Sequence, residues 1–438
     1  MIISTGCAQT VRPLGDKELF VKGDNWCVIG DSITHGGAYH KYIYLYYATR
    51  FPNARFDLFN CGVGGDTATG TLSRMNTDIL AHKPTIAIIM LGMNDVWWLN
   101  NDHITLADYT RDLTAMVDQL AKDNCRVMLF TPSIYDETAK TGTDIDPKHA
   151  GLNLFAQQVR RIAAQKKLPC IDAFGCMMEI TAKMQAADPA FTLIHPDRAH
   201  PKDEGHFIMA YQFLKDMNQP ALVSKLVLNA KTAQAAVQQN CRAGNVIFGD
   251  NISFSLLENS LPFPVSEIPA GAVSLVPFTS DLNQEILQIN GLESGDYELL
   301  IDQKLMGVYS ADEFEQGLNL ALVAATPQNI QAQAVAQLNS SRHSIEANKL
   351  RYIAMMEYGV LKNLHPADDV DNALKDVDAY MAKITDPAAI EAENQRWKPY
   401  REYKPIQAQL IKEAAELNEK MWAANKPAAH SFLIKRVK

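Results

Sequence analysis

Trp26-Cys27-Val28-Ile29-Gly30-Asp31-Ser32 is the stretch that decides the fold, because an apolar run stops abruptly at a Gly-Asp turn. A short apolar run bounded by turn residues is typical of a strand buried in a parallel sheet. Residues 85–91 repeat this pattern and form the clearest predicted strand, followed by Gly92-Met93-Asn94-Asp95. Carboxyl ends of parallel strands meet at one edge of a sheet, so we expect the polar residues of these turns to lie together.

Strand and helix patterns alternate between residues 25 and 220. Strands are predicted at 26–30, 55–60, 85–91, 126–130 and 168–171, and helices at 41–51, 66–80, 106–122, 152–167 and 205–218. Asp66 is predicted to be the N-cap of the second helix. Such alternation predicts an α/β fold, a three-layer α/β/α parallel sheet with helices on both faces.

The pattern changes after residue 222. Strand-like runs separated by Gly, Asn, Asp and Pro lie at 226–230, 245–248, 252–257, 285–289 and 297–301. They predict a small antiparallel β domain, a sandwich, over 223–310. Residues 311–438 are predicted to be a helical C-terminal region that ends in a last strand at 430–437. Thr326-Pro327 is the expected cap of a helix that reaches about Leu364. The α/β domain is placed at 20–222.

Composition bounds the class of protein. The chain has 438 residues, 47% of them hydrophobic and 21% charged, with a net charge of −9 that argues against nucleic-acid binding. It has no apolar run near the roughly 20 residues that a membrane span needs. Met1 to Gln9 resemble the end of a secretory signal, so export or a periplasmic location is expected. A polar leader on a cytoplasmic protein is the alternative.

Seven cysteines are scattered through the chain without a Cys-x-x-Cys pair or a zinc-binding spacing. Cys27, Cys61, Cys125 and Cys170 fall at or beside predicted strands. We expect them to be buried free thiols.

Three segments carry candidate catalytic residues. Ser32 follows the first strand and can act as a nucleophile, while Asn94 follows the third and offers an uncharged amide donor. In Asp197-Arg198-Ala199-His200, the spacing lets Asp197 orient the His200 imidazole as a base. Each segment alone is equally compatible with a helix cap or a turn.

Other residues compete for these roles. His195 and His206 flank the proposed base, but His206 falls inside a predicted helix and is expected to pack or cap. Three histidines suggest a metal site, yet the His-x-x-x-His pair with Glu is missing. Gly62-x-Gly64 is not continued by the third glycine of a dinucleotide fingerprint, because Thr67 stands there. No metal and no cofactor are expected.

Together the segments resemble the SGNH hydrolase family, the GDSL esterases and lipases, over residues 25–220. The four matching blocks are Gly30-Asp31-Ser32-Ile33-Thr34, Gly64-Gly65-Asp66-Thr67, Gly92-Met93-Asn94-Asp95 and Asp197-Arg198-Ala199-His200. The resemblance implies a flavodoxin-like fold, with Ser32 as nucleophile, His200 as base and Asp197 as its orienter. It also implies an oxyanion hole made of the Ser32 amide, the Gly65 amide and the Asn94 side chain.

The expected function is that of a serine ester hydrolase working through an acyl-enzyme, with acetyl esters of carbohydrates as the leading substrate class. A lipase, lysophospholipase or thioesterase of the same family is the alternative, and a non-catalytic carbohydrate-binding protein is the competing class. The expected partner is a small-molecule or polysaccharide ester; the sequence predicts no oligomeric state.

Three further residues are candidates for substrate binding. Arg198 stands where the family often has Gly, so it either contacts substrate or faces solvent. Trp97 and Trp98 either stack on a sugar ring or pack the following loop.

Overall fold

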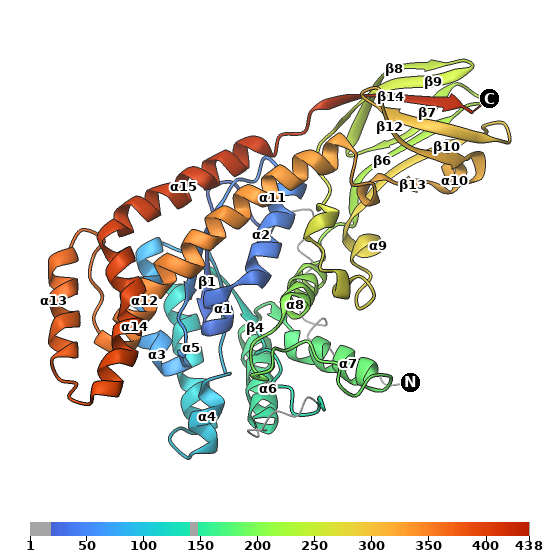
Figure 1. The fold of residues 1–438 in the computed structure, drawn as a ribbon. Coiled ribbons are helices and arrows are strands. Elements are labelled where there is room, and N and C mark those ends of the chain that lie inside the picture. The colour runs from blue at the N-terminus through green and yellow to red at the C-terminus, as the bar shows by residue number, and fades with distance from the viewer. Residues whose placement is uncertain (1–18, 141–147, 438) are drawn as a thin grey trace. The chain divides into compact units, whose positions relative to one another are not determined.

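The computed structural model describes residues 19–140 and 148–437 (Figure 1). The described chain forms two compact units. The first comprises residues up to 43, 56–217 and 340–418, and the second comprises 44–55, 218–339 and the residues from 419 onward. Residues of the predicted C-terminal region therefore occur in both units.

A five-stranded parallel sheet is the centre of the first unit, in the order β2-β1-β3-β4-β5. Its strands are β1 (Asn25–Gly30), β2 (Asp57–Gly62), β3 (Ile86–Met90), β4 (Arg126–Phe130) and β5 (Cys170–Ile171). The predicted strands and the predicted α/β class are confirmed. The strands β1 and β3 are apolar and buried on both faces because both faces of the sheet are covered.

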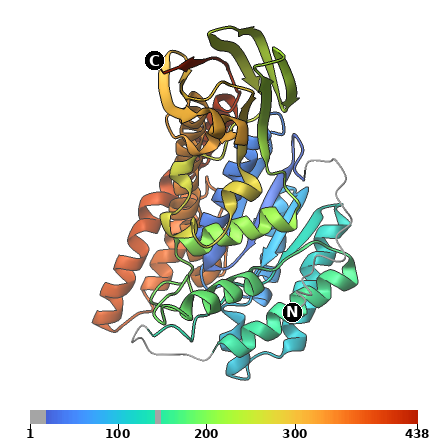
Figure 2. The same ribbon diagram turned by 90° about the vertical axis from the view of Figure 1, so that its right-hand side faces the viewer.

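Both faces of the sheet contact helices. On one face of β1, the Trp26 ring lies 6.4 Å from that of Phe213 in α8 (Asp203–Asp216). The next residue, Cys27, points to the other face, where its thiol lies 3.9 Å from the carbonyl of Ile79. Figure 2 shows the blue and cyan strands with green helices on the viewer's side.

The helices of this unit agree with the sequence prediction in part. Helices α2 (Ala38–Arg50), α5 (Leu106–Lys122), α6 (His149–Lys166) and α8 were predicted, whereas α4 (Asp95–Asn100) and α7 (Ala173–Gln185) were missed. Tyrosines 39, 42, 44, 46 and 47 of α2 are all buried.

Asp66 is not a helix N-cap, so that prediction was wrong. Thr67 caps α3 (Ala68–Ser73), and its hydroxyl accepts the Gly70 N–H at 3.1 Å. The Asp66 carboxylate instead accepts hydrogen bonds from the Thr71 hydroxyl and from Arg74 Nε, both at 2.7 Å. The Asp66 carboxylate therefore pairs with the charged Arg74 side chain instead of capping the helix.

The second unit contains the predicted sandwich. One sheet has the order β13-β10-β6-β7 and the other β12-β11-β14-β9-β8. Their strands are β6 (Leu222–Asn229), β7 (Gln234–Gln239), β8 (Cys241–Phe248), β9 (Asn251–Glu258), β10 (Gln284–Asn290), β11 (Asp296–Ile301), β12 (Lys304–Ser310), β13 (Leu318–Asn319) and β14 (Ala429–Arg436). One apolar cluster joins the two sheets, and the predicted last strand is β14. The sandwich is not wholly antiparallel, because β6 and β10 pair in parallel.

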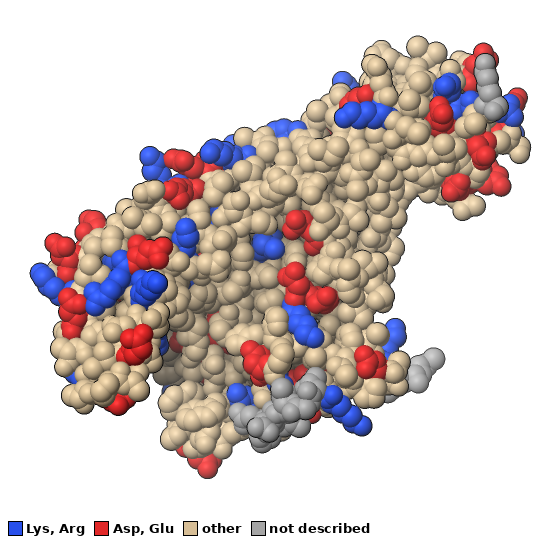
Figure 3. Space-filling model, in the orientation of Figure 1, with Lys and Arg blue, Asp and Glu red and all other residues tan. Residues whose placement is uncertain are grey.

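Helices α10 (Ala311–Gln316), α11 (Pro327–Ile345), α12 (Arg351–Met356), α13 (Val370–Met381), α14 (Pro387–Tyr403) and α15 (Gln407–Ala424) follow β12. The Thr326 hydroxyl accepts the Asn329 N–H at 3.2 Å, which confirms the predicted cap. Helical structure then continues through two π-helical turns to Leu361, close to the predicted end. Figure 3 shows Lys and Arg mixed with Asp and Glu over α13 and α14.

The predictions about the cysteines, membrane spans and the N-terminus have different outcomes. Cys27, Cys61, Cys125 and Cys170 are buried and are not in disulfides, as expected. Within the described ranges, the helices are all too short or too polar to cross a membrane. The signal-like residues 1–9 lie outside the described residues, so the expectation of export stays a prediction.

Candidate active site

The strand register brings three of the candidate segments together. Gly30 at the end of β1 is level with Gly62 of β2 and with Met90 of β3. The Val63 N–H also donates to the Gly30 carbonyl at 3.1 Å. Ser32, Gly65 and Asn94 therefore follow neighbouring strands at the same carboxyl edge of the sheet, which is where α/β sheets bind ligands.

Ser32, His200 and Asp197 form one continuous chain of hydrogen bonds. Ser32 Oγ lies 2.7 Å from His200 Nε2, and His200 Nδ1 lies 2.6 Å from Asp197 Oδ2. A serine next to an imidazole that a carboxylate orients is the arrangement that nucleophilic catalysis needs.

The Asp197 carboxylate also holds the turn of the loop that carries it. Asp197 Oδ1 accepts the N–H groups of Ala199 and His200, both at 3.0 Å, so one carboxylate oxygen fixes the turn while the other faces the imidazole. Burial raises the pKa of Asp197, but the hydrogen bonds from His200 and Ala199 outweigh it, and the pKa lies below the usual value. Asp197 is thus an anion at neutral pH and can stabilise a protonated His200.

Two buried carboxyl groups lie beneath this edge of the sheet. Asp31 caps α1 (Ser32–Gly36) by accepting the Ile33 N–H at 3.0 Å, and Asp95 accepts the Ala68 N–H at 2.9 Å. Burial raises the pKa of each to about 7. Repulsion from Asp66 adds to the shift of both groups, and repulsion from Asp31 adds to the shift of Asp95. These groups are therefore largely uncharged below pH 7, although both are aspartates.

The candidate oxyanion donors are held by the segment around Asp66. Asn94 Nδ2 donates one hydrogen bond to the Asp66 carbonyl at 2.9 Å, which fixes the amide and leaves its second N–H available. Gly65 has φ +79, a backbone conformation that favours glycine, and the space at its missing Cβ is open. The Ser32 N–H lies in the first turn of α1, where the helix supplies no acceptor.

The rival histidines have other roles. His206 is partly buried with its ring stacked on Tyr39 at 6.2 Å, and desolvation lowers its pKa to about 3. It packs, as predicted. The His195 N–H donates to the His200 carbonyl at 2.7 Å, so His195 helps to shape the loop. Over residues 19–140 and 148–437, no three His, Cys, Asp or Glu side chains are grouped to hold a metal ion.

Arg198 is buried. The residue is 4% exposed, which contradicts the solvent-facing alternative, while substrate contact stays a prediction. The guanidinium donates to the backbone carbonyls of Asp136 and Ala139 at 2.7 and 3.3 Å, so it ties two loops together. Arg198 also has φ +64, a left-handed backbone conformation that glycine adopts more readily than arginine.

Trp97 and Trp98 are 44% and 42% exposed, so neither is packed away as a core residue. They contact each other and the His103 ring. Trp98 lines a cavity of about 700 Å³ that also reaches Gly65. Much of the lining is polar: Asp66, Thr67, Ser73, Arg74, Thr77, Tyr358, Lys362, Asn363 and Arg396.

Sequence reasoning missed the contribution of the C-terminal helices to this cavity. Met355 of α12 packs on Gly64, and Arg351 donates to the Gly62 carbonyl at 2.8 Å. These residues are almost 300 positions from the loop in sequence. No local pattern could have revealed the contact.

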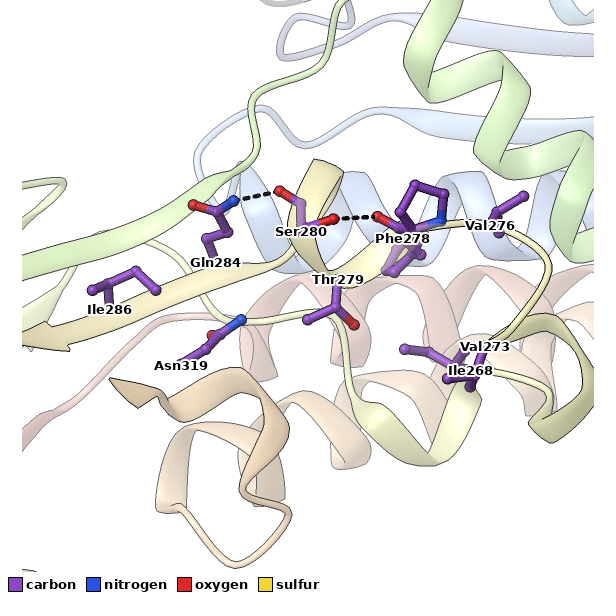
Figure 4. Close-up of a pocket in the computed structure, with 10 residues that line it drawn as sticks. Ile268, Val273, Val276, Phe278, Thr279, Ser280, Gln284, Ile286 and Asn319 are labelled. Atoms are coloured by element: carbon purple, nitrogen blue, oxygen red, sulfur yellow. Dashed lines mark hydrogen bonds between the residues drawn. The ribbon is translucent and has the colours of Figure 1, made fainter. Parts of the chain in front are cut away.

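The second unit has a pocket of its own, of about 470 Å³ (Figure 4). It lies beside α9 (Phe278–Leu282) and the start of β10, with Val273, Phe278 and Ile286 among its lining residues. None of the candidate catalytic residues lines it.

Comparison with known proteins gives similarity over nearly the whole chain as well as over its first half. The family model described as the GDSL-like lipase/acylhydrolase family matches residues 28–208. A solved structure described as BT4096, a gut microbial diltiazem-metabolizing enzyme, is 30% identical with a TM-score of 0.85, covering 98% of this chain and 100% of that one. An acetylxylan esterase of Geobacillus stearothermophilus is 26% identical over 216 residues, 44% of this chain and 94% of that protein.

These findings define the class of protein as a carboxylic ester hydrolase. The chain belongs to the GDSL-like lipase/acylhydrolase family.

Proposed function

We propose that the protein hydrolyses esters through an acyl-enzyme on Ser32, with His200 as general base and Asp197 as its orienting carboxylate. The observation that carries this proposal is the hydrogen-bond chain from Ser32 Oγ to His200 to Asp197, with links of 2.7 and 2.6 Å. The chain lies at the edge of the sheet where ligands bind in this class of fold.

In the first half of the reaction, Ser32 Oγ attacks the ester carbonyl while His200 Nε2 takes the hydroxyl proton. Asp197 stabilises the resulting imidazolium through Nδ1. The tetrahedral intermediate collapses, and His200 returns the proton to the leaving alcohol. In the second half, water attacks the acyl group on Ser32 by the same steps and releases the acid.

The negative charge on the carbonyl oxygen needs donors that are already in place. We assign this role to the backbone N–H groups of Ser32 and Gly65 and to the second N–H of the Asn94 amide. Each such donor is typically worth a factor of about 10²–10³ in rate. Asp31 and Asp95, largely protonated below pH 7, oppose this charge less than two carboxylates would.

We propose acetyl esters of carbohydrates as the substrate class. The cavity beside Gly65 is rich in polar side chains and has Trp98 on its wall, which suits a sugar better than a fatty acyl chain. The similarity to an acetylxylan esterase supports the same class. Lipase, lysophospholipase and thioesterase activity are the alternatives within the family. Diltiazem is a second candidate substrate, because a diltiazem-metabolizing enzyme is similar over the whole chain.

The test is a comparison of wild type, Ser32→Ala and the control Ser280→Ala. Substrates are p-nitrophenyl acetate, p-nitrophenyl laurate, acetyl-coenzyme A, acetylated xylan and diltiazem. We expect wild type and the control to release acetate from xylan and p-nitrophenol from the short ester, and Ser32→Ala to lose both activities. A preference for laurate or for the thioester would contradict the substrate class, and an active Ser32→Ala would contradict the mechanism.

A further inference from the structure

A buried chain of charged side chains links helix α12 to the loop that carries Gly65. Arg351 begins α12 and is 6% exposed. Its Nε donates to the Gly62 carbonyl at 2.8 Å, and its two terminal nitrogens each donate to a carboxylate oxygen of Asp78 at 2.8 Å. The planar guanidinium thus spans a backbone carbonyl and a carboxylate at once, which a lysine cannot do.

The chain continues from Asp78 to the candidate oxyanion donors. Asp78 also accepts a hydrogen bond from Arg74, and Arg74 Nε donates to Asp66 Oδ2 at 2.7 Å. The Asp66 carbonyl accepts the Asn94 amide N–H at 2.9 Å, and Gly65 is its neighbour in sequence. Both Gly65 and Asn94 are therefore held through Asp66.

Electrostatics keeps this chain ionised. Burial by itself raises the pKa of Asp78, but Arg351 and then Arg74 outweigh that effect and hold the pKa well below its usual range. The carboxylate is therefore charged at neutral pH. A buried charge with two cationic partners is a rigid anchor, because each group needs the others.

Helix α12 also covers the tip of the loop by packing. A Cβ added at Gly64 would lie 2.8 Å from Met355 Sδ. Within the loop, the Asp66 N–H donates to the Val63 carbonyl at 3.1 Å, and Gly65 has φ +79 with open space at its Cβ position. Arg351 and Met355 thus hold the loop from outside residues 28–208, the part that the family model matches.

We propose that Arg351 is a positioning residue for ester hydrolysis, one that holds loop 62–66 so that the Gly65 N–H and the Asn94 amide point at the developing oxyanion. The proposal rests on the function proposed above. Oxyanion donors work only when they are already oriented, and small displacements cost large factors in rate. By this proposal, the C-terminal helices help to position the oxyanion donors.

The test uses the full chain with Arg351→Lys and Arg351→Gln, and Arg342→Gln as the matched control. Arg342 is a buried arginine of the preceding helix α11, paired with Glu346 at 2.6 Å. Three quantities are measured: kcat and KM for p-nitrophenyl acetate, the inhibition constant of phenylboronic acid, and the pH dependence of kcat/KM. The boronate forms a tetrahedral adduct on serine whose oxygen occupies the oxyanion site.

For both Arg351 variants, we expect kcat to fall about 10- to 100-fold with KM changed less than about threefold. The boronate constant should rise by a similar factor, and the apparent pKa of the pH profile should stay the same because His200 is untouched. The Arg342→Gln control should keep wild-type kcat and boronate affinity even where its thermal stability falls.

Two outcomes would overturn the proposal. One is a kcat loss in Arg342→Gln equal to that in Arg351→Lys. The other is normal boronate binding in folded Arg351→Lys. This variant keeps the positive charge, so it still tests the proposal if Arg351→Gln does not fold. Failure of the proposed function has a different signature, because wild type itself would then show no Ser32-dependent hydrolysis.

Discussion

Replacing Asp197 by Asn probes the orientation of His200 with little change of shape. In the structure, Asp197 Oδ1 holds the turn by accepting two backbone N–H groups at 3.0 Å, and an asparagine oxygen can keep both bonds. The other oxygen, 2.6 Å from His200 Nδ1, would become an NH₂ group that cannot accept a hydrogen bond. The imidazole then favours the tautomer with its proton on Nε2, so it cannot take the Ser32 proton.

The size of the effect follows from the two roles of the carboxylate. Loss of the correct tautomer in a fully buried triad costs about 10⁴ in kcat. The Asp197 side chain is half exposed, so water offers a partial substitute acceptor and screens the lost charge. We therefore expect kcat to fall about 10³-fold, equivalent to about 4 kcal/mol of barrier.

The assay is the kcat for p-nitrophenyl acetate between pH 6 and 9, with unfolding temperature measured in parallel. Asp188→Asn is the control, because Asp188 also accepts a backbone N–H in an exposed turn but does not contact His200. We expect wild-type stability in Asp197→Asn. A kcat within tenfold of wild type would refute the view that Asp197 orients the base.

Three more predictions concern the residues around the triad. Asp95→Asn should gain stability relative to wild type as pH rises from 5 to 8, by at most about 3 kcal/mol in thermal unfolding. The reason is that a carboxyl group whose folded pKa is raised to about 7 stabilises the fold at low pH and loses that contribution as it ionises. A stability difference that does not vary with pH would contradict this. Arg198→Ala should cost about 1–3 kcal/mol of stability, because two buried carbonyls lose their donor, and it should leave KM for small acetates unchanged. A raised KM at unchanged stability would mean that Arg198 contacts substrate. Trp98→Ala should raise KM about tenfold on acetylated xylooligosaccharides and leave p-nitrophenyl acetate unaffected, with Trp97→Ala as control; equal effects of the two variants would argue against stacking in the cavity.

Strands and long helices of the first unit could be predicted because burial leaves a local signature. The apolar runs of β1 and β3 and the two-faced pattern of α5 are consequences of what each segment packs against. The strands β7 and β12 were missed; neither contains a fully buried residue, so burial left little signature in their sequences. The short helix α4 was read as a turn because six residues carry no period.

The candidate site likewise contains residues that could be placed from the sequence and residues that could not. Ser32, Gly65 and Asn94 could be placed together because turns that follow adjacent parallel strands share an edge. The left-handed backbone of Arg198 and its buried guanidinium depend on a loop 60 residues away, so its position could not be predicted from local sequence. Arg351 was missed for the same reason, over a much longer separation.

The most direct test of the central claim is to identify the residue that becomes covalently modified. Full-length protein is treated with diethyl p-nitrophenyl phosphate, which phosphorylates activated serines, and the adduct is located by peptide mass spectrometry. The account predicts one diethylphosphoryl group on Ser32, loss of esterase activity in step with its formation, and no adduct in Ser32→Ala. Modification of a different residue, or full activity with Ser32 modified, would contradict it.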